Sequence, residues 1–257
     1  MKAEDIFRLD GLVALVTGAS SGLGARFAEV AAANGAAVVL VARRADRLEA
    51  LAGKIARAGG RAIVAEADVT DRAAVARAFD TAEQAFGTVT LLVNNVGIAH
   101  ADRAVELPEA VWRRVLDTNL DAAFFTAQEA ARRMIAANRR GSIVNIASIL
   151  GLGVAKGSIA YVVAKAGVVQ MTKALALELA FKGVRVNAIA PGFVMTEMTE
   201  DYLTGEGAGM TRHIPVGRFG EASDLDGAFL LLASDAGRFM AGSIVVVDGG
   251  QVLAIPG

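Results

Sequence analysis

The feature that most constrains the fold of this chain is the alternation of short apolar segments with longer helical patterns. The apolar segments are rich in β-branched residues and almost uninterrupted by polar ones, as expected for strands covered on both faces. They are Leu12–Val16, Ala37–Val41, Ala62–Ala65, Leu91–Val93, Ser142–Ile146, Val184–Ile189 and Ile244–Val247. Strands that alternate with helices form parallel sheets with helices on both faces. The sequence therefore predicts an α/β fold with a doubly wound, seven-stranded parallel sheet.

Between these segments, apolar residues recur at helical spacing. The third helical pattern has Thr70 as a candidate N-cap and is predicted to end at Gly87. Later helical patterns cover residues 118–138, 158–181 and 222–233. No linker or low-complexity segment divides the chain, so we expect residues 1–257 to form a single domain.

Composition excludes several classes of function. A net charge of -1 over 257 residues gives no reason to expect a nucleic acid or an acidic membrane as partner. There is no cysteine, and the two histidines, His100 and His213, lack ligand spacing, so no metal site is expected. Residues 1–10 lack the apolar core of a signal peptide, and no uninterrupted apolar run has the length of a membrane span. We therefore expect a cytoplasmic protein.

A glycine-rich turn follows the first predicted strand and precedes a helical pattern. Glycines allow a tight turn and close approach of the backbone, and the helix N-terminus offers free N–H groups to a pyrophosphate. The candidate phosphate-binding residues are Gly18, Ser20, Ser21, Gly22, Leu23 and Gly24. A glycine-rich turn without a ligand is the alternative interpretation.

The same turn also fits a second motif. Gly18–Gly22 has the G-x-S-x-G pattern of the nucleophile elbow in α/β-hydrolases, with Ser20 as the nucleophile. Asp201 and His213 are the residues that could complete a triad. Against this, the motif follows the first strand, so no earlier strand can supply the loop that completes an oxyanion hole.

The turn after the second strand, Ala42-Arg43-Arg44, bears on the choice of nicotinamide cofactor. An acidic residue near this position accepts the adenosine ribose hydroxyls of NAD, whereas an arginine accommodates the 2′-phosphate of NADP. The turn has no acid, so Arg43 is predicted to contact the phosphate and NADP is favoured over NAD. Alternatively, both arginines begin a solvated helix.

Tyr161 and Lys165 lie four residues apart in the predicted helix 158–181, so they share one face of that helix. An isolated phenol has a pKa near ~10, and a nearby positive charge favours its anion. Tyr161 is therefore a candidate general acid/base. Ser148, thirteen residues upstream at the end of the fifth strand, can join the pair. A tyrosine and a lysine on a half-exposed helix are the alternative.

Taken together, these motifs resemble the short-chain dehydrogenase/reductase family, and the resemblance covers essentially the whole chain. The matching segments are Thr17–Gly24, Asp68-Val69, Asn94–Gly97, Asn119, Ser148, Tyr161 with Lys165, and Pro191-Gly192 with Thr196. Ile214–Gly220 and Gly242–Gly250 resemble the subgroup of tetrameric β-ketoacyl reductases and secondary alcohol dehydrogenases. Two residues depart from the family pattern: Val96 replaces the usual alanine and adds bulk beside the cofactor channel, and Ala164 stands where serine is common.

The resemblance implies a Rossmann-type fold and assigns roles to four catalytic residues. Tyr161 would exchange a proton with the substrate oxygen, and Lys165 would lower the pKa of this phenol and hold the nicotinamide ribose. Ser148 would stabilise the reacting oxygen. Asn119 would hold a water molecule that links Lys165 to solvent, although the residues alone favour a surface amide.

The resemblance also implies a set of cofactor contacts. Asp68 would contact the adenine and Asn95 a ribose, with a helix-capping role as the alternative for Asp68. Pro191, Val194 and Thr196 would hold the nicotinamide amide. The same motifs add Val69, Val96, Gly97 and Gly192 to the cofactor site.

The expected function is NADP(H)-dependent interconversion of a ketone and a secondary alcohol, a small-molecule substrate. The alternatives are an NAD-dependent alcohol dehydrogenase of the same family and a non-catalytic NADP-binding sensor. Residues 193–217 are a candidate substrate loop, or a loop that is merely mobile. The apolar faces of 118–138 and 158–181, together with the resemblance, indicate a homotetramer or dimer.

Overall fold

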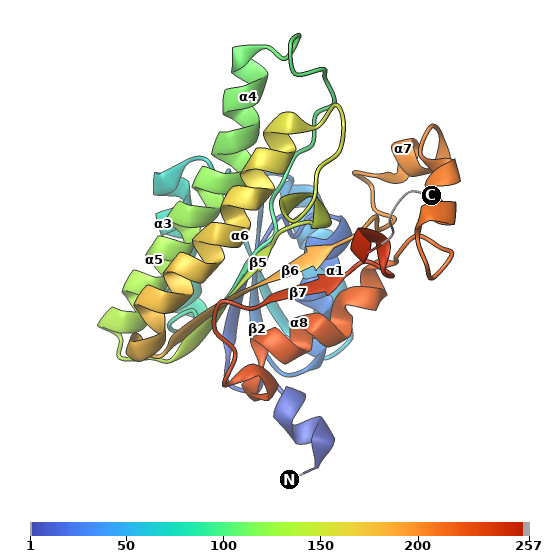
Figure 1. Cartoon of the computed structure of the whole chain (residues 1–257). Coiled ribbons are helices and arrows are strands. Elements are labelled where there is room, and N and C mark those ends of the chain that lie inside the picture. Colours follow the sequence, from blue (N-terminus) through green and yellow to red (C-terminus); the bar gives the residue numbers. More distant parts are fainter. Residues whose placement is uncertain (1, 254–257) are drawn as a thin grey trace.

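The computed structural model describes residues 2–253, and its centre is a parallel sheet of seven strands (Figure 1). The strand order is β3-β2-β1-β4-β5-β6-β7. The strands are β1 Val13–Thr17, β2 Ala37–Ala42, β3 Arg61–Glu66, β4 Leu91–Asn94, β5 Gly141–Ile146, β6 Val184–Pro191 and β7 Ile244–Val247. All seven predicted strands are present, so the predicted fold class is confirmed. The largest difference is in β6, which extends two residues beyond Ile189 and pairs Pro191 with Val247.

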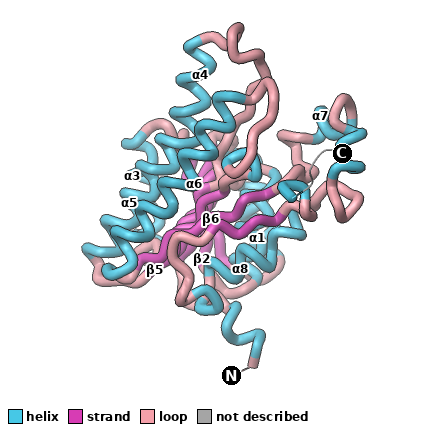
Figure 2. Tube along the Cα trace, viewed as in Figure 1, coloured by secondary structure: helices cyan, strands magenta, loops and turns pink. Residues whose placement is uncertain are grey.

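Helices cover both faces of the sheet, as Figure 2 shows. Three helices pack on one face: α1 Gly22–Ala33, α2 Ala45–Arg57 and α8 Asp226–Ala233. The rings of Phe27 in α1 and Phe229 in α8 are in contact there. The helices α3 Arg72–Phe86, α5 Ala122–Ala136 and α6 Ile159–Leu179 pack on the other face. The remaining helices are α4 Glu109–Leu116 and α7 Glu200–Thr204, with short helices η1 Ala3–Phe7, η2 Asp117–Asp121, η3 Ile149–Gly151, η4 Ala180–Lys182, η5 Ala208–His213, η6 Ala222–Leu225, η7 Asp235–Gly237 and η8 Gln251–Leu253.

Two predicted helix boundaries are wrong. The helical pattern predicted over 118–138 begins earlier, because α4, η2 and α5 run on from Glu109, and η2 is a turn of π-helix. The N-cap of α3 is Asp71 rather than Thr70, because the Asp71 carboxylate accepts hydrogen bonds from the backbone of Ala73 and Ala74 at 2.8 and 3.1 Å. The predicted end of α3 at Gly87 is confirmed, and Gly87 has a φ of 93°.

The strand order indicates where on the sheet a ligand can bind. The chain moves outward from β1 to β2 and β3, then returns to β4 on the other side of β1. Ligands of such sheets bind in the crevice at this reversal, beyond the carboxyl ends of the strands. The predicted site segments all follow the carboxyl ends of strands β1 to β6, so the topology gathers them at one edge.

The helix formed by α6 and η4, Ile159–Lys182, is long and apolar enough to cross a membrane when judged by length and composition alone. In the structure it packs along β6 and buries Lys165, Val168 and Thr172 against the sheet. A single helix of this kind is weak evidence for a membrane span, and one face of α6 packs on the sheet.

Candidate active site

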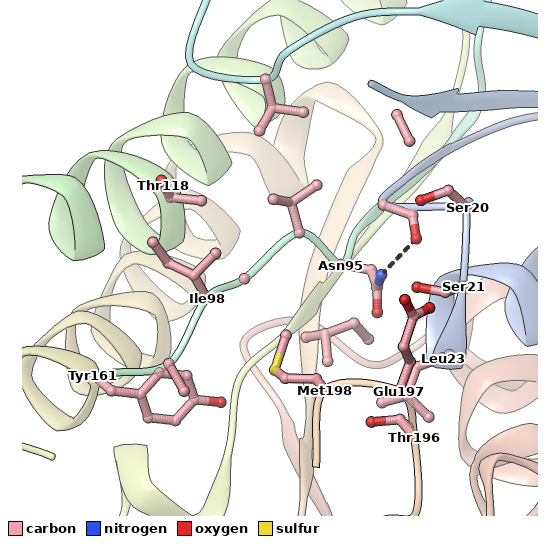
Figure 3. Close-up of a pocket in the computed structure, with 18 of the residues that line it drawn as sticks. Ser20, Ser21, Leu23, Asn95, Ile98, Thr118, Tyr161, Thr196, Glu197 and Met198 are labelled. Atoms are coloured by element: carbon pink, nitrogen blue, oxygen red, sulfur yellow. Dashed lines mark hydrogen bonds between the residues drawn. The ribbon is translucent and has the colours of Figure 1, made fainter. Parts of the chain in front are cut away.

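A cavity of about 1070 Å³ lies at the carboxyl ends of the strands (Figure 3). Most of the predicted site residues line it: Gly18, Ser20, Ser21, Gly22, Leu23, Arg43, Asp68, Val69, Asn95, Val96, Gly97, Ser148, Tyr161, Lys165, Pro191, Gly192, Val194 and Thr196. The two exceptions, Gly24 and Asn119, lie directly behind its wall. Figure 3 shows Tyr161 at one end of the cavity and Ser20 and Ser21 at the other.

The glycine-rich turn has the shape that a pyrophosphate requires. Gly18 and Gly22 have φ values of 68° and 54°, in the left-handed region that disfavours larger residues. A Cβ on Gly24 would lie 2.2 Å from the carbonyl oxygen of Gly18, so a side chain there would collide with the turn. Because α1 begins at Gly22, its free N–H groups face the cavity end of the turn. The residues present therefore fit a dinucleotide phosphate.

The acidic residue at the adenosine end, Asp68, holds a local turn. Its Oδ1 accepts hydrogen bonds from the backbone N–H and the hydroxyl of Thr70 at 2.9 and 2.7 Å. The Thr70 backbone hydrogen bond is the main cause of a lowered pKa for Asp68, and Arg43 adds to it. Asp68 does not cap α3, since Asp71 does. Arg43 is exposed, with its Nη1 3.7 Å from Asp68 Oδ2.

Arg44, the second residue of the Arg-Arg pair, is held more tightly than Arg43. Its Nε and Nη2 donate to Ser20 Oγ at 3.1 and 2.9 Å, and Nη2 also donates to Ser21 Oγ at 2.8 Å. Arg44 therefore joins the end of β2 to the glycine-rich turn and lines the cavity. The sequence signal for this contact was the pair of adjacent arginines after β2. Their order in the chain does not indicate which of them contacts Ser20.

The lysine of the Tyr161–Lys165 pair is buried at the end of β5. Lys165 Nζ donates to the carbonyl oxygen of Ile146 at 2.7 Å and lies 5.6 Å from the centre of the Tyr161 ring. Burial lowers the pKa of Lys165 to about 8. At pH 7 Lys165 is therefore protonated in most molecules, but it holds its proton less tightly than an exposed lysine does.

The pKa of Tyr161 differs from the expectation. Burial raises it above its ordinary value, and the interaction with the Ser148 side chain acts in the opposite direction without overcoming burial. The net pKa of the phenol is therefore raised rather than lowered, because the loss of hydration dominates. Ser148 follows β5, and its Oγ accepts a hydrogen bond from Leu150 at 3.1 Å.

Asn119 is a buried amide in the π-helical turn η2, so the surface-amide alternative is wrong. Its Nδ2 donates to the carbonyl oxygens of Ile98 and Val115 at 2.9 Å each, and its Oδ1 accepts from the backbone N–H of Ile98 at 3.0 Å. A Cβ on Gly97 would lie 2.7 Å from Asn119 Oδ1 and 3.5 Å from Lys165 Nζ. Asn119 thus fixes the chain after β4 beside Lys165, and π-turns of this kind are frequent at functional sites.

The segment after β6 closes the cavity on its other side. Val194 forms a β-bridge with Gly220, and Thr199 Oγ1 donates to the carbonyl oxygen of Val194 at 2.6 Å. A Cβ on Gly22 would lie 3.4 Å from the Thr196 side chain, so this segment is packed against the glycine-rich turn. The departure from the family pattern at Val96 places its side chain in the cavity wall beside Gly18.

Sequence reasoning missed one wall of the cavity. Several residues of α4 and η2 contribute to it, among them Arg113, Arg114 and Thr118. Because the helical pattern was predicted to begin at residue 118, the preceding turns were not assigned to an element. The apolar spacing of Val111, Trp112, Val115 and Leu116 is the signal that could have revealed the helix that carries this wall.

The hydrolase alternative does not fit the geometry. Ser20 Oγ accepts hydrogen bonds from Arg44, whereas His213 Nε2 accepts one from Arg212. Within residues 2–253 no hydrogen bond joins Ser20, Asp201 and His213 into a triad. Ser20 is therefore not activated by a histidine in this structure.

Comparison with known proteins agrees with this geometry. A family model described as enoyl-(acyl carrier protein) reductase matches residues 18–251. Galactitol 2-dehydrogenase (L-tagatose-forming) of Cereibacter sphaeroides is 42% identical over 98% of this chain and 100% of its own length. Cis-4-hydroxycyclohexanecarboxylate dehydrogenase of Sinomonas cyclohexanicum is 42% identical over 93% of this chain and 95% of its own. The chain belongs to the short-chain dehydrogenase/reductase family.

A solved structure extends the comparison to three dimensions. A putative 2-deoxy-D-gluconate 3-dehydrogenase from Agrobacterium tumefaciens, with bound NADP, is similar with a TM-score of 0.90 and 41% identity. The match covers 97% of this chain and 99% of that one. As a short-chain dehydrogenase/reductase, the protein is an oxidoreductase that interconverts a secondary alcohol and a ketone with a nicotinamide cofactor.

Proposed function

We propose that this short-chain dehydrogenase/reductase uses NADP(H) and that Tyr161 is its general acid/base. One observation carries the proposal: a single cavity has Tyr161, Lys165 and Ser148 at one end and the glycine-rich turn with two arginines at the other. The NADP bound to the similar Agrobacterium tumefaciens structure supports the choice of cofactor. Turnover of a panel of ketones, followed by absorbance of the nicotinamide, tests the proposal, and cofactor binding without turnover would favour the sensor alternative.

Each catalytic side chain has a distinct task in this mechanism. Bound NADPH supplies the hydride for reduction. Tyr161 donates the proton that the carbonyl oxygen takes up, and Ser148 donates a hydrogen bond that stabilises charge on that oxygen. The ammonium of Lys165, which lies 5.6 Å from the centre of the Tyr161 ring, favours the phenolate left on Tyr161. After Tyr161 has given up its proton, this attraction opposes the cost of burying its negative charge.

The remaining site residues are proposed to position the cofactor. Asn119 would hold a water molecule on the proton path from Lys165, in addition to its hydrogen bonds to Ile98. Asp68 and Val69 would contact the adenine, Asn95 a ribose, and Pro191, Val194 and Thr196 the nicotinamide. The free N–H groups at the start of α1 would bind the pyrophosphate.

The substrate is proposed to be a ketone or secondary alcohol with an apolar body. Val96, Ile98 and Met198 form apolar parts of the cavity wall near the proposed reacting atoms. Of the two relatives named above, the dehydrogenase whose name describes a cyclohexane ring fits these walls better than the one named for a polyol. Residues 1–257 are proposed to form one domain, with 193–217 as the substrate loop.

The 2′-phosphate contact gives a test of cofactor choice. We expect Arg43→Ala to weaken NADPH binding about tenfold or more and to change NADH binding little, because charge-assisted contacts to a phosphate are strong. Fluorescence titration of both cofactors measures the two affinities. Equal losses for NADPH and NADH would show that Arg43 does not contact the 2′-phosphate.

The outer face of α6 and η4 supports association of copies of this chain. Leu177 and Phe181 are 83% and 77% exposed on a helix whose other face packs on the sheet. We propose that this face, with α5, forms a dimer or tetramer interface. The enzyme is also proposed to be cytoplasmic, since NADP(H) is available in the cytoplasm.

Light scattering at micromolar concentration tests the interface. The expected mass is two or four times that of the 26.4 kDa chain, and Phe181→Lys is expected to lower it. Val105→Lys is the matched control, because Val105 is also an exposed apolar residue but lies in the loop before α4. A monomeric native protein would contradict the proposal, as would equal effects of the two variants.

A further inference from the structure

Glu197 forms a charged network across the cavity mouth. Its Oε1 accepts a hydrogen bond from Arg44 Nη1 at 2.9 Å, and its Oε2 accepts one from Arg47 Nη1 at 2.5 Å. Glu197 follows Thr196 after β6, whereas the two arginines lie at the start of α2, so the network joins segments about 150 residues apart. In Figure 3 the Glu197 side chain lies beside Ser21, away from Tyr161.

The network lies at the proposed adenosine end of the cavity. Ser20, Ser21, Arg44 and Glu197 all line the cavity, and Arg43 lies next to them. Positive charge and hydroxyl donors gathered in this way form a binding site for an anion. In the structure, the anion at this position is the carboxylate of Glu197.

The hydrogen bonds of Arg44 leave little capacity for a second anion. A guanidinium has five N–H donors, and Arg44 uses four of them on Ser20, Ser21 and Glu197. A phosphate that binds Arg44 through two parallel hydrogen bonds must therefore replace one of these partners. The Glu197 carboxylate is the partner that a phosphate would also repel by its charge.

We propose that Glu197 determines cofactor specificity by occupying the arginine site that the 2′-phosphate of NADP takes. This inference rests on the proposed use of NADP(H). The doubly charged phosphate displaces the carboxylate from Arg44, whereas NAD, which has no phosphate at this position, leaves the Arg44–Glu197 pair in place. Glu197 therefore weakens the binding of a 2′-phosphate and leaves the rest of the dinucleotide site unaffected.

The test uses two fragments that differ by the 2′-phosphate, 2′,5′-ADP and 5′-AMP, titrated against the full chain by calorimetry. Glu197→Gln is expected to tighten 2′,5′-ADP about three- to tenfold, since it removes a competitor held by two partly exposed ion pairs. Binding of 5′-AMP is expected to stay unchanged. Glu200→Gln is the matched control, because Glu200 is an exposed acid three residues away and none of the ion pairs among residues 2–253 includes it.

The outcomes separate this inference from the proposed function. If native protein prefers 2′,5′-ADP over 5′-AMP but Glu197→Gln binds it equally or more weakly, Glu197 is not a competitor and this inference fails alone. If native protein shows no such preference, the proposed use of NADP(H) fails, and the role of Glu197 fails with it. If Glu200→Gln tightens 2′,5′-ADP binding as much as Glu197→Gln does, the gain comes from removing any nearby negative charge, and the inference is overturned. Circular dichroism of each variant checks that the fold is retained.

Discussion

Replacing Tyr161 with phenylalanine is expected to lower the rate of ketone reduction by a factor of about 10²–10⁴, the range that proton transfer by a side chain contributes. In the proposed mechanism the phenol gives a proton to the substrate oxygen, and phenylalanine keeps the shape and burial of the side chain. The affinity for NADPH is expected to stay within about threefold, because the proposed contacts of the arginines and the glycine-rich turn are to the distant end of the dinucleotide. Stopped-flow absorbance and fluorescence titration measure the two quantities.

Tyr202→Phe is the matched control for this variant. Tyr202 is the other tyrosine of the chain, lies in α7, and donates its hydroxyl to Met210 Sδ at 3.3 Å. We expect this substitution to leave the rate within a few-fold of the native value. Native activity in Tyr161→Phe would refute the proposed acid/base, and equal losses in both variants would point to a general effect of removing a hydroxyl.

Replacing Lys165 with methionine is expected to abolish activity and to change how stability depends on pH. The pKa of Lys165 falls from 10.5 to about 8 on burial. Between these values the unfolded chain holds a proton that the folded protein has released, so the free energy of unfolding of native protein rises with pH. The full rise corresponds to roughly 3 kcal/mol, since one unit of pKa shift is about 1.4 kcal/mol. Methionine at 165 has no proton to lose, so the variant lacks this rise.

Urea unfolding without added cofactor, at pH 7 and pH 10, measures the effect. The quantity to compare is the unfolding free energy of native protein minus that of Lys165→Met, which is expected to be larger at pH 10. Taking this difference removes the contribution of groups that do not interact with Lys165. Lys173→Met, on the same helix but exposed, serves as control and is expected to show no such change. A difference that is equal at both pH values would contradict the burial cost assigned to Lys165.

The parts of the fold that sequence predicted well depend on local patterns. The strand Ile244–Val247 was predicted with its observed bounds, because a run of β-branched residues between turns has few other conformations. The start of α3 was predicted one residue too early, since Thr70 and Asp71 can both cap a helix and hydrogen bonding of Asp68 to Thr70 decides between them. The start of α4 was missed because Pro108 and Glu109 carry a weaker start signal than the later apolar pattern.

The same distinction holds within the candidate site. Adjacent arginines after β2 indicated a phosphate contact, but the pairing of Arg44 with Ser20 and Ser21 depends on how α2 begins relative to the glycine-rich turn. The hydrogen bonds of Glu197 to the two arginines had no sequence signal, because these partners lie about 150 residues away. The raised pKa of Tyr161 likewise depends on burial, which spacing from Lys165 does not reveal.

By itself, the sequence determined the order of strands and helices, the glycine-rich turn and the chemical groups available for catalysis. These follow from short-range rules of backbone geometry and apolar spacing, which act within a few residues. The tertiary structure alone decided which charged groups meet across the cavity and how strongly Tyr161 and Lys165 lose their hydration. Electrostatic interactions depend on distance and burial in space, and the distances here are set by the packing of segments far apart in the chain.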